Sequence, residues 1–143
     1  MTASSDVRYE CTRQTFRPDA RYPVRWLDWD QDYALARTMW PDTCPLTPAV
    51  WREARESGYR YCGAIEQQRI VSIAAVWRYS ETAWEVAAVR TRPEACMRGY
   101  TQAVVSLVTA RILDAGKQAT CTTARDNVAM QRTAESVGFN RIA

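Results

Sequence analysis

The sequence predicts an α/β protein in which one mixed, mostly antiparallel sheet carries helices on both faces. Two observations lead to this fold class. Three strand-like segments between residues 59 and 90 follow one another with short polar turns, which is the arrangement of an antiparallel meander. Before and after this meander apolar residues recur at helical spacing, and a further strand separates the last two helical segments.

Residues 1–23 are expected to be a polar N-terminal segment, interrupted by prolines, in which only Val7–Cys11 has the composition of a strand. Farther along, Thr47 before Pro48 is a typical helix start, because threonine accepts a bond from a free amide and proline suits the first helical position. The expected elements are strands at 7–11 and 24–27, helices at 30–40 and 48–57, strands at 59–66, 69–79 and 82–90, a helix at 100–115, a strand at 118–123, a helix at 127–137 and a strand stub within 139–143.

Glycines end both helices of the second half. In the central helix, apolar residues recur every four positions from Val104 until Gly116 stops the pattern. The last helix is expected to take its cap from Asp126 or Asn127 and to end at Gly138. The two helices and the strand between them complete the predicted sheet.

The length of 143 residues is enough for one domain, and 47% hydrophobic with 24% charged residues is typical of globular proteins. No apolar run approaches the roughly 18–20 residues that span a bilayer. Met1–Asp6 lacks the basic and apolar pattern of a signal peptide. We therefore expect a cytoplasmic protein without a membrane segment.

The sequence contains no histidine. This excludes Ser-His-Asp and Cys-His catalysis and the common histidine zinc sites, each of which needs an imidazole. No metal is expected. Acid and base chemistry must come from Glu, Asp, Tyr, Cys, the one lysine or water.

Neither the cysteines nor the charge indicates a specialised partner. The five cysteines are odd in number, are widely spaced and form no Cys-x-x-Cys pair, so free thiols in a reducing compartment are expected. The net charge of +3 is mild and the arginines are scattered, so no nucleic acid is expected as a partner. The cysteines are Cys11, Cys44, Cys62, Cys96 and Cys121.

The junction between residues 82 and 102 carries the most chemical information. The strand-like run Glu85–Val89 passes through Pro93 to Arg98-Gly99-Tyr100, where the long helix begins. A helix N-terminus presents unpaired amides and a positive dipole, so a glycine junction of this kind can hold a phosphate or pyrophosphate. The alternative is a glycine needed for steric reasons alone.

The segment 69–139 resembles the GNAT superfamily of acetyl-CoA-dependent N-acetyltransferases. The family motif Gln/Arg-x-x-Gly-x-Gly/Ala opens a central helix and follows a strand ending in Val and a Pro-Glu pair; Val89, Pro93-Glu94 and Arg98-Gly99-Tyr100 fit this layout. A second block, Asn127–Phe139, is similar to the helix and Gly-Phe pair that close the family's fold. The resemblance implies a single acyltransferase domain over 1–143, with an acceptor-side half at 24–66 and a coenzyme-binding half at 69–139.

The resemblance implies acetyl-CoA as the cofactor, with coenzyme A as the product. Two residues depart from the motif: Cys96 stands where the family has Gln or Arg, and Thr101 where it has Gly or Ala. A threonine there adds a branched side chain near the expected pyrophosphate, although its hydroxyl can donate to an oxygen. The expected coenzyme contacts are Ala88, Val89, Cys96, Met97, Arg98, Gly99, Tyr100, Thr101 and Asn127.

The implied reaction is direct transfer of an acetyl group to a primary amine of a small molecule or a protein. The backbone amide of Ala88 or Val89 is expected to stabilise the oxyanion. Glu85 is the candidate general base, because it is the one ionisable residue in the stretch Trp84–Val89. It lies thirteen residues before Arg98, a spacing similar to that of the base in lysine-acetylating members. Burial beside Trp77 or Trp84 would raise its pKa; the alternative is a solvent-facing strand residue.

The family's proton donor, a tyrosine four residues before the Gly-Phe glycine, is replaced by Ala134. Tyr100, Tyr79 or water are the candidate substitutes. The alternative function is a GNAT-fold coenzyme-binding or regulatory protein with little turnover, and a third possibility is an unrelated α/β domain with a structural glycine.

Two further expectations concern the acceptor and the sheet edge. Trp26, Trp29 and Trp40 fall where the family builds its acceptor pocket, which favours an apolar or aromatic amine. After the Gly-Phe pair the family's C-terminal hairpin is shortened to 140–143. The missing strand is expected from Val7–Cys11, from a second subunit in a homodimer, or not at all.

Overall fold

The computed structural model describes residues 6–142; the first five residues of the predicted N-terminal segment and the last residue of the C-terminal stub lie outside this range. Seven strands form one sheet in the order β2-β3-β4-β5-β6-β1-β7. The strands are β1 (Asp6–Cys11), β2 (Val24–Trp26), β3 (Tyr59–Glu66), β4 (Arg69–Trp77), β5 (Ala83–Thr91), β6 (Gln118–Ala124) and β7 (Asn140–Ile142). The α-helices are α1 (Tyr33–Ala36), α2 (Pro48–Glu56), α3 (Tyr100–Asp114) and α4 (Val128–Val137).

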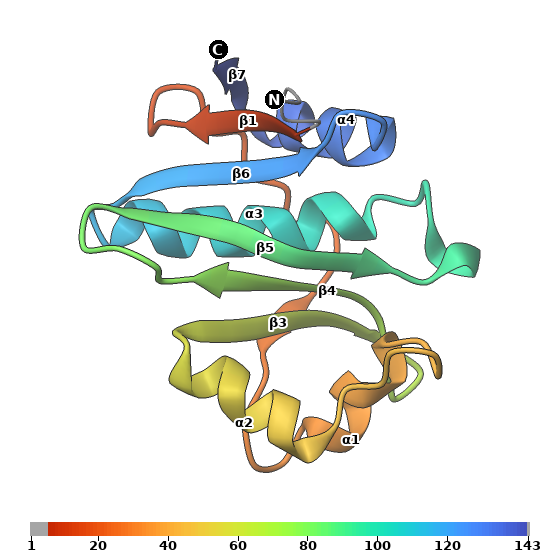
Figure 1. Ribbon diagram of the computed structural model, residues 1–143. Helices are drawn as coiled ribbons and strands as arrows, with labels where there is room; N and C mark the ends of the chain where they lie inside the picture. The colour runs from red at the N-terminus through yellow and green to blue at the C-terminus, as the bar shows by residue number, and fades with distance from the viewer. Residues whose placement is uncertain (1–5, 143) are drawn as a thin grey trace.

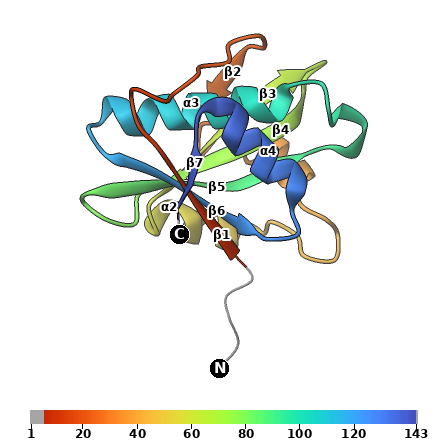
Figure 2. The same ribbon diagram turned by 90° about the horizontal axis from the view of Figure 1, so that it is seen from above.

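Helices cover both faces of the sheet, as predicted (Figures 1 and 2). On the face covered by α3 and α4, which we call the α3 face, the buried core includes Tyr9, Ile112 and Phe139. On the opposite face, the α2 face, α1 and α2 pack over a second core around Trp51 and Tyr61. No helix within residues 6–142 is long and apolar enough to cross a lipid bilayer.

The central strands form the predicted antiparallel meander, and the next strand joins it in parallel. Strands β5 and β6 pair only from Ala83↔Gln118 to Val86↔Cys121. Beyond these pairs β5 continues to Thr91 and β6 continues to residue 124, but the two strands are no longer partners. The sheet therefore opens between them at their carboxyl ends.

A β-bulge lies in β5 where the opening starts. The register with β4 passes from Ala75↔Ala87 to Ile73↔Arg90, so Ala88 and Val89 together oppose a single residue of β4. Ala88 has a φ of 53°, in the left-handed region that costs a non-glycine residue about 1–2 kcal/mol. A bulge of this kind takes its extra residue out of the regular ladder and re-aims the backbone.

The N-terminal strand lies between β6 and β7 in the sheet. Strand β1 pairs antiparallel with β6 through all six of its residues, from Asp6↔Ala124 to Cys11↔Ala119. Its other edge pairs with β7. Of the three alternatives for the missing strand, the structure contains the first, since residues 6–11 of the same chain provide it.

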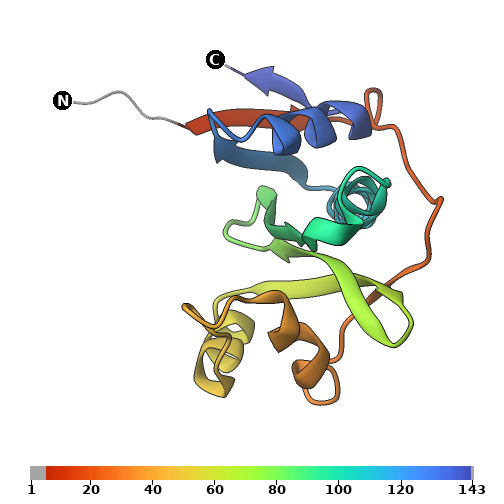
Figure 3. The same ribbon diagram turned by 90° about the vertical axis from the view of Figure 1, so that its right-hand side faces the viewer.

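Residues 12–23, which we call the strap, run from β1 to β2 across the α3 face (Figure 3). The backbone amide of Asp19 donates to the Ser106 hydroxyl at 2.8 Å, and the amide of Arg17 donates to the Val137 carbonyl at 2.8 Å. The ring of Tyr22 stacks on Tyr100 with 4.0 Å between centroids. The strap is thereby fixed to both helices of this face.

The predicted helix over 30–40 is wrong in extent, because only Tyr33–Ala36 is α-helical and Arg37–Met39 continues as a 3-10 turn. The physical reason lies before the helix, where the carboxylate of Asp28 accepts bonds from the amides of residues 30 and 31 at 2.9 and 2.8 Å. This local turn competes with the first helical turn. The next helix begins as predicted, with the Thr47 hydroxyl accepting from the Val50 amide at 3.2 Å.

Candidate active site

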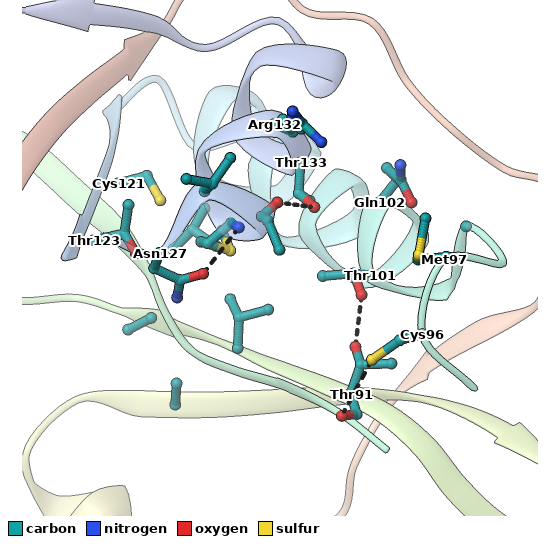
Figure 4. Close-up of a pocket in the computed structure, with 18 of the residues that line it drawn as sticks. Thr91, Cys96, Met97, Thr101, Gln102, Cys121, Thr123, Asn127, Arg132 and Thr133 are labelled. Atoms are coloured by element: carbon teal, nitrogen blue, oxygen red, sulfur yellow. Dashed lines mark hydrogen bonds between the residues drawn. The ribbon is translucent and has the colours of Figure 1, made fainter. Parts of the chain in front are cut away.

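A cavity of about 890 Å³ occupies the opening between β5 and β6. The N-termini of α3 and α4 both lie at its wall (Figure 4), so two positive helix ends face the same space. Side chains of both sheet faces contribute to the lining, since Val86 and Cys121 belong to the α3 face and their neighbours Ala87 and Thr122 point the other way. The cavity therefore reaches from one face of the sheet to the other.

The loop before α3 is shaped by two residues in the left-handed region, Met97 with φ 64° and Gly99 with φ 95°. A Cβ atom on Gly99 would lie 2.5 Å from a guanidinium nitrogen of Arg21, so the strap places this cation directly over the glycine. The guanidinium of Arg21 pairs with Asp19 through Nε and Nη2, which holds the pKa of that carboxyl below its ordinary value, chiefly through the hydrogen bond. The bonds to Asp19 use only Nε and Nη2 of Arg21, so the N–H groups of Nη1 are not used in this pair.

Thr101, one of the two departures from the family motif, is tied to the sheet by a chain of hydroxyl groups. Its Oγ1 lies 2.6 Å from Oγ1 of Thr91 (Figure 4). Oγ1 of Thr91 in turn lies 2.7 Å from Oγ of Ser72. The Ser72 hydroxyl also donates to the carbonyl of Arg90 at 3.3 Å. The chain fixes the first turn of α3 to β5 and β4, and it directs the threonine hydroxyl toward β5.

The other motif residues lie where the sequence places them around the cavity. The Cys96 thiol donates to the carbonyl of Arg92 at 3.4 Å, and the exposed side chain of Met97 lines the mouth. Arg98 also lines the cavity, and its carbonyl accepts from the Tyr22 hydroxyl at 2.7 Å. At the other wall Asn127 caps α4 by accepting from the Met130 amide at 3.1 Å.

Tyr100 is the predicted contact that the structure directs away from the cavity. Its ring stacks on Tyr22, and its hydroxyl donates to the Glu66 carboxylate at 3.3 Å. Burial and the nearby Glu66 raise the pKa of this phenol, with burial the larger cause. Its side chain thus packs at the start of α3 and has a structural role there, instead of serving as a proton donor in the cavity.

Glu85 lies on the α2 face, next to the place where the cavity opens onto that face. Its Oε1 accepts from the Thr122 hydroxyl at 3.0 Å and from the Thr120 hydroxyl at 3.4 Å. Thr122 lines the cavity while Glu85 does not, so one hydroxyl separates the carboxylate from the cavity wall. Trp77 is its cross-strand partner. Trp84, the other expected neighbour, packs with the core of the α3 face.

Ala134 is completely buried in the core of the α3 face and does not line the cavity. Among the residues 6–142, no tyrosine belongs to the cavity lining. Cys121 does line it, and burial, aided by the charge of Glu85, raises the pKa of its thiol to about 12. Such a thiol is too weakly acidic to exchange protons near neutral pH.

The three tryptophans expected around the acceptor are divided between the two faces. Trp29 and Trp40 pack on the α2 face. Trp26 lies on the opposite, α3 face, with the guanidinium of Arg60 4.9 Å from its ring centroid. The reason is register, because Trp26 pairs with Cys62, whose side chain belongs to the α3-face core.

Sequence reasoning missed several residues of the cavity wall. Thr122 and Thr123 of β6 line the cavity, as do Gln102 of α3 and Arg132 of α4. The sequence located the starts of α3 and α4, and this was a usable signal for Gln102 and Arg132. Arg21 had no such signal, because it lies 78 positions before Gly99 and meets it only through the strap.

Comparison with known proteins agrees with this geometry. The family model of FR47-like proteins matches residues 61–143. The chain belongs to the FR47-like family and, with it, to the GNAT superfamily. A comparison with curated protein sequences found no match.

Solved structures share the fold at low sequence identity. A protein described as a GNAT-family acetyltransferase from Novosphingobium aromaticivorans is 21% identical with a TM-score of 0.75, over 96% of this chain and 59% of that chain. A GNAT-family acetyltransferase from Colwellia psychrerythraea is 11% identical with a TM-score of 0.75, over 95% and 52%. AAC(6')-Iy, solved with the bisubstrate analog CoA-S-monomethyl-acetylneamine, is 15% identical with a TM-score of 0.66, over 82% and 90%. The chain thus spans less than two thirds of the first two structures.

Proposed function

We propose that this chain is a single acyltransferase domain that transfers an acetyl group from acetyl-CoA to a primary amine. The observation that carries the proposal is the cavity in the opened sheet, which reaches from the starts of α3 and α4 on one face to Thr122 on the other, where the Thr122 hydroxyl donates to Glu85. Membership of the GNAT superfamily supports the same reaction. The neighbour AAC(6')-Iy was solved with a coenzyme A adduct, which supports the choice of coenzyme.

The residues around the cavity fit the chemistry of the coenzyme. Its phosphates are anions, and two helix N-termini with the guanidinium groups of Arg21, Arg98 and Arg132 surround the mouth. The Arg21 guanidinium fills the space that a side chain on Gly99 would occupy, so a phosphate at the start of α3 would meet this cation together with the free amides of the helix. The separated edges of β5 and β6 offer peptide groups to the amide-bearing arm of the coenzyme.

The reaction needs a neutral amine and a stabilised oxyanion. Bound acetyl-CoA would supply the acetyl thioester. The amine attacks the carbonyl carbon, so that a C–N bond forms, the C–S bond breaks and coenzyme A leaves as a thiolate. One proton of the ammonium group would go to Glu85 before the attack, and the second would leave the nitrogen for water as the C–S bond breaks. The backbone amide of Ala88 or Val89, in the bulge that lines the cavity, would donate to the oxyanion.

Water is the proposed proton source for the departing thiolate. The family's tyrosine position is Ala134, which is buried away from the cavity. Tyr100 donates to Glu66 outside the cavity, and Tyr79 lies on the α2 face beside Thr120. A thiolate is a good leaving group, so catalysis does not require a side-chain acid here.

Two measurements test the proposed function in sequence. Coenzyme A is titrated into the protein by calorimetry, and thiol release from acetyl-CoA is then followed with a panel of amines. We expect binding followed by release with at least one amine. Binding without release on any amine would instead favour the alternative, a coenzyme-binding or regulatory protein with little turnover, and no binding would refute both.

Replacing Arg21 by Gln is expected to weaken coenzyme A binding about fivefold, because a charge-assisted bond to a phosphate is lost while Asp19 remains. Calorimetry at low and high salt measures the change in affinity, which should be smaller at high salt because salt screens the attraction between Arg21 and the phosphate. The control is Arg17→Gln, which changes the same charge on the same strap without lining the cavity. Equal affinities for the two variants would remove Arg21 from the proposed site.

A further inference from the structure

A row of aromatic rings runs along the α2 face toward Glu85. Tyr59 stacks on Trp77 with 5.5 Å between ring centroids and 10° between planes. Trp77 then contacts Tyr79 at 5.1 Å, and Tyr79 is 42% exposed. The Trp77 ring is fixed because its Nε1 donates to the carbonyl of Ser57 at 3.2 Å. The row is therefore a packed aromatic surface with an accessible end at Tyr79.

The accessible end of this row is joined to the carboxylate. The hydroxyls of Tyr79 and Thr120 lie 3.4 Å apart, and Thr120 in turn donates to Glu85. Since Tyr79 lies in the turn after β4 and Thr120 on β6, the Tyr79 side chain spans β5 next to Glu85. On the other side of Glu85 lies Thr122 with the exit of the cavity.

Only small groups separate Glu85 from that exit. Ala87, two positions along β5 on the same face, lines the cavity and contributes no more than a methyl group. A primary amine above Ala87 has the Glu85 carboxylate beside it and the cavity beneath it. Whatever the amine is attached to then extends toward the rings of Tyr79 and Trp77.

We propose that the acceptor is a primary amine joined by a short linker to an aromatic ring, with the ammonium group on Glu85 and the ring against Tyr79 and Trp77. This inference rests on the proposed function and names the substrate class for the same site. Aromatic rings pair favourably in stacked and edge-on geometries, and the ammonium is attracted both by the carboxylate and by the ring faces.

A polyamine fits this surface less well, since it requires carboxylates spaced along its length. Trp77, Glu85, Thr120 and Glu10 lie in register across four neighbouring strands, so Glu10 is on the side of Glu85 away from Trp77. The Glu10 carboxylate accepts a hydrogen bond from the Gln118 side chain. Arg8, the partner of Thr122, adds a positive charge to that side. The direction left for the body of the acceptor is the aromatic row.

The test compares 2-phenylethylamine, n-butylamine and spermidine in two measurements. Calorimetry measures the affinity of each amine for the protein saturated with coenzyme A, and thiol release from acetyl-CoA gives kcat/KM. We expect 2-phenylethylamine to bind and react about tenfold better than n-butylamine, with spermidine no better than n-butylamine. Equal values for the three amines, or a preference for spermidine, would overturn the proposed acceptor class.

Variants locate the preference on the surface. Tyr79→Leu should reduce the affinity for 2-phenylethylamine about fivefold and leave those for n-butylamine and coenzyme A unchanged. The control Trp26→Leu removes a ring from the opposite face and should preserve the preference. A preference that survives Tyr79→Leu would contradict the assignment. Absence of thiol release with every amine would refute the proposed function, and the binding measurement still decides the acceptor class.

Discussion

Replacing Glu85 by Gln is expected to lower kcat/KM for the acceptor amine by about 100-fold at pH 7. A primary amine with a pKa near about 10 is almost entirely ammonium at neutral pH, so removal of its proton requires a base. Above about pH 10 the amine is already neutral, and the difference between the two proteins should largely disappear. The measurement is the pH–rate profile of thiol release.

Glu10→Gln is the matched control. Glu10 is on β1 and Glu85 is on β5, and both carboxylates lie on the same face of the sheet on either side of Thr120 of β6. This variant should keep the wild-type profile. Coenzyme A affinity should be unchanged in both variants, since neither carboxylate lines the cavity. If Glu85→Gln also leaves the profile unaltered, Glu85 is not the base.

Replacing Gly138 by Ala is expected to lower the free energy of unfolding by about 3–4 kcal/mol. The residue has a φ of 105°, and an added Cβ would lie 2.1 Å from the backbone carbonyl oxygen of Thr15. The strap cannot move away easily, because the amide of Arg17 is bonded to the carbonyl of Val137 just before this glycine. Urea unfolding followed by tryptophan fluorescence measures the change.

Gly116→Ala separates the two causes of that loss. Gly116 also has a positive φ, 74°, but nothing lies within 4 Å of an added Cβ. Its replacement should therefore cost only the backbone strain, about 1 kcal/mol. Equal losses for both variants would mean that the strap does not pack against Gly138 as the structure has it.

Local signals predicted much of the fold and of the cavity wall. The extent of β3, the cap at Asn127 and the glycines at 99 and 138 follow from neighbouring residues in the chain, and the structure places them accordingly. The motif residues from Cys96 to Thr101 line the cavity with the exception of Tyr100. Such features depend on backbone requirements that a few adjacent residues satisfy.

Features that depend on distant contacts were beyond the reach of the sequence. The sequence named Val7–Cys11 as one of three sources of the missing strand but could not choose among them, and it gave no sign of the position of Arg21 over Gly99; both features join segments far apart in the chain. The face of Trp26 depends on register, and a shift of one residue would have put it on the α2 face. The left-handed Ala88 has no signal either, since alanine does not favour that conformation.

The central claim, that the opened sheet binds acetyl-CoA, is tested most directly by a crystal structure of the complex with acetyl-CoA. We predict that the phosphates lie at the N-terminus of α3 near Gly99 and that the thioester carbonyl accepts a bond from the amide of Ala88 or Val89 within about 3.2 Å. Coenzyme bound outside the cavity between β5 and β6, or a thioester carbonyl that meets neither amide, would contradict this account.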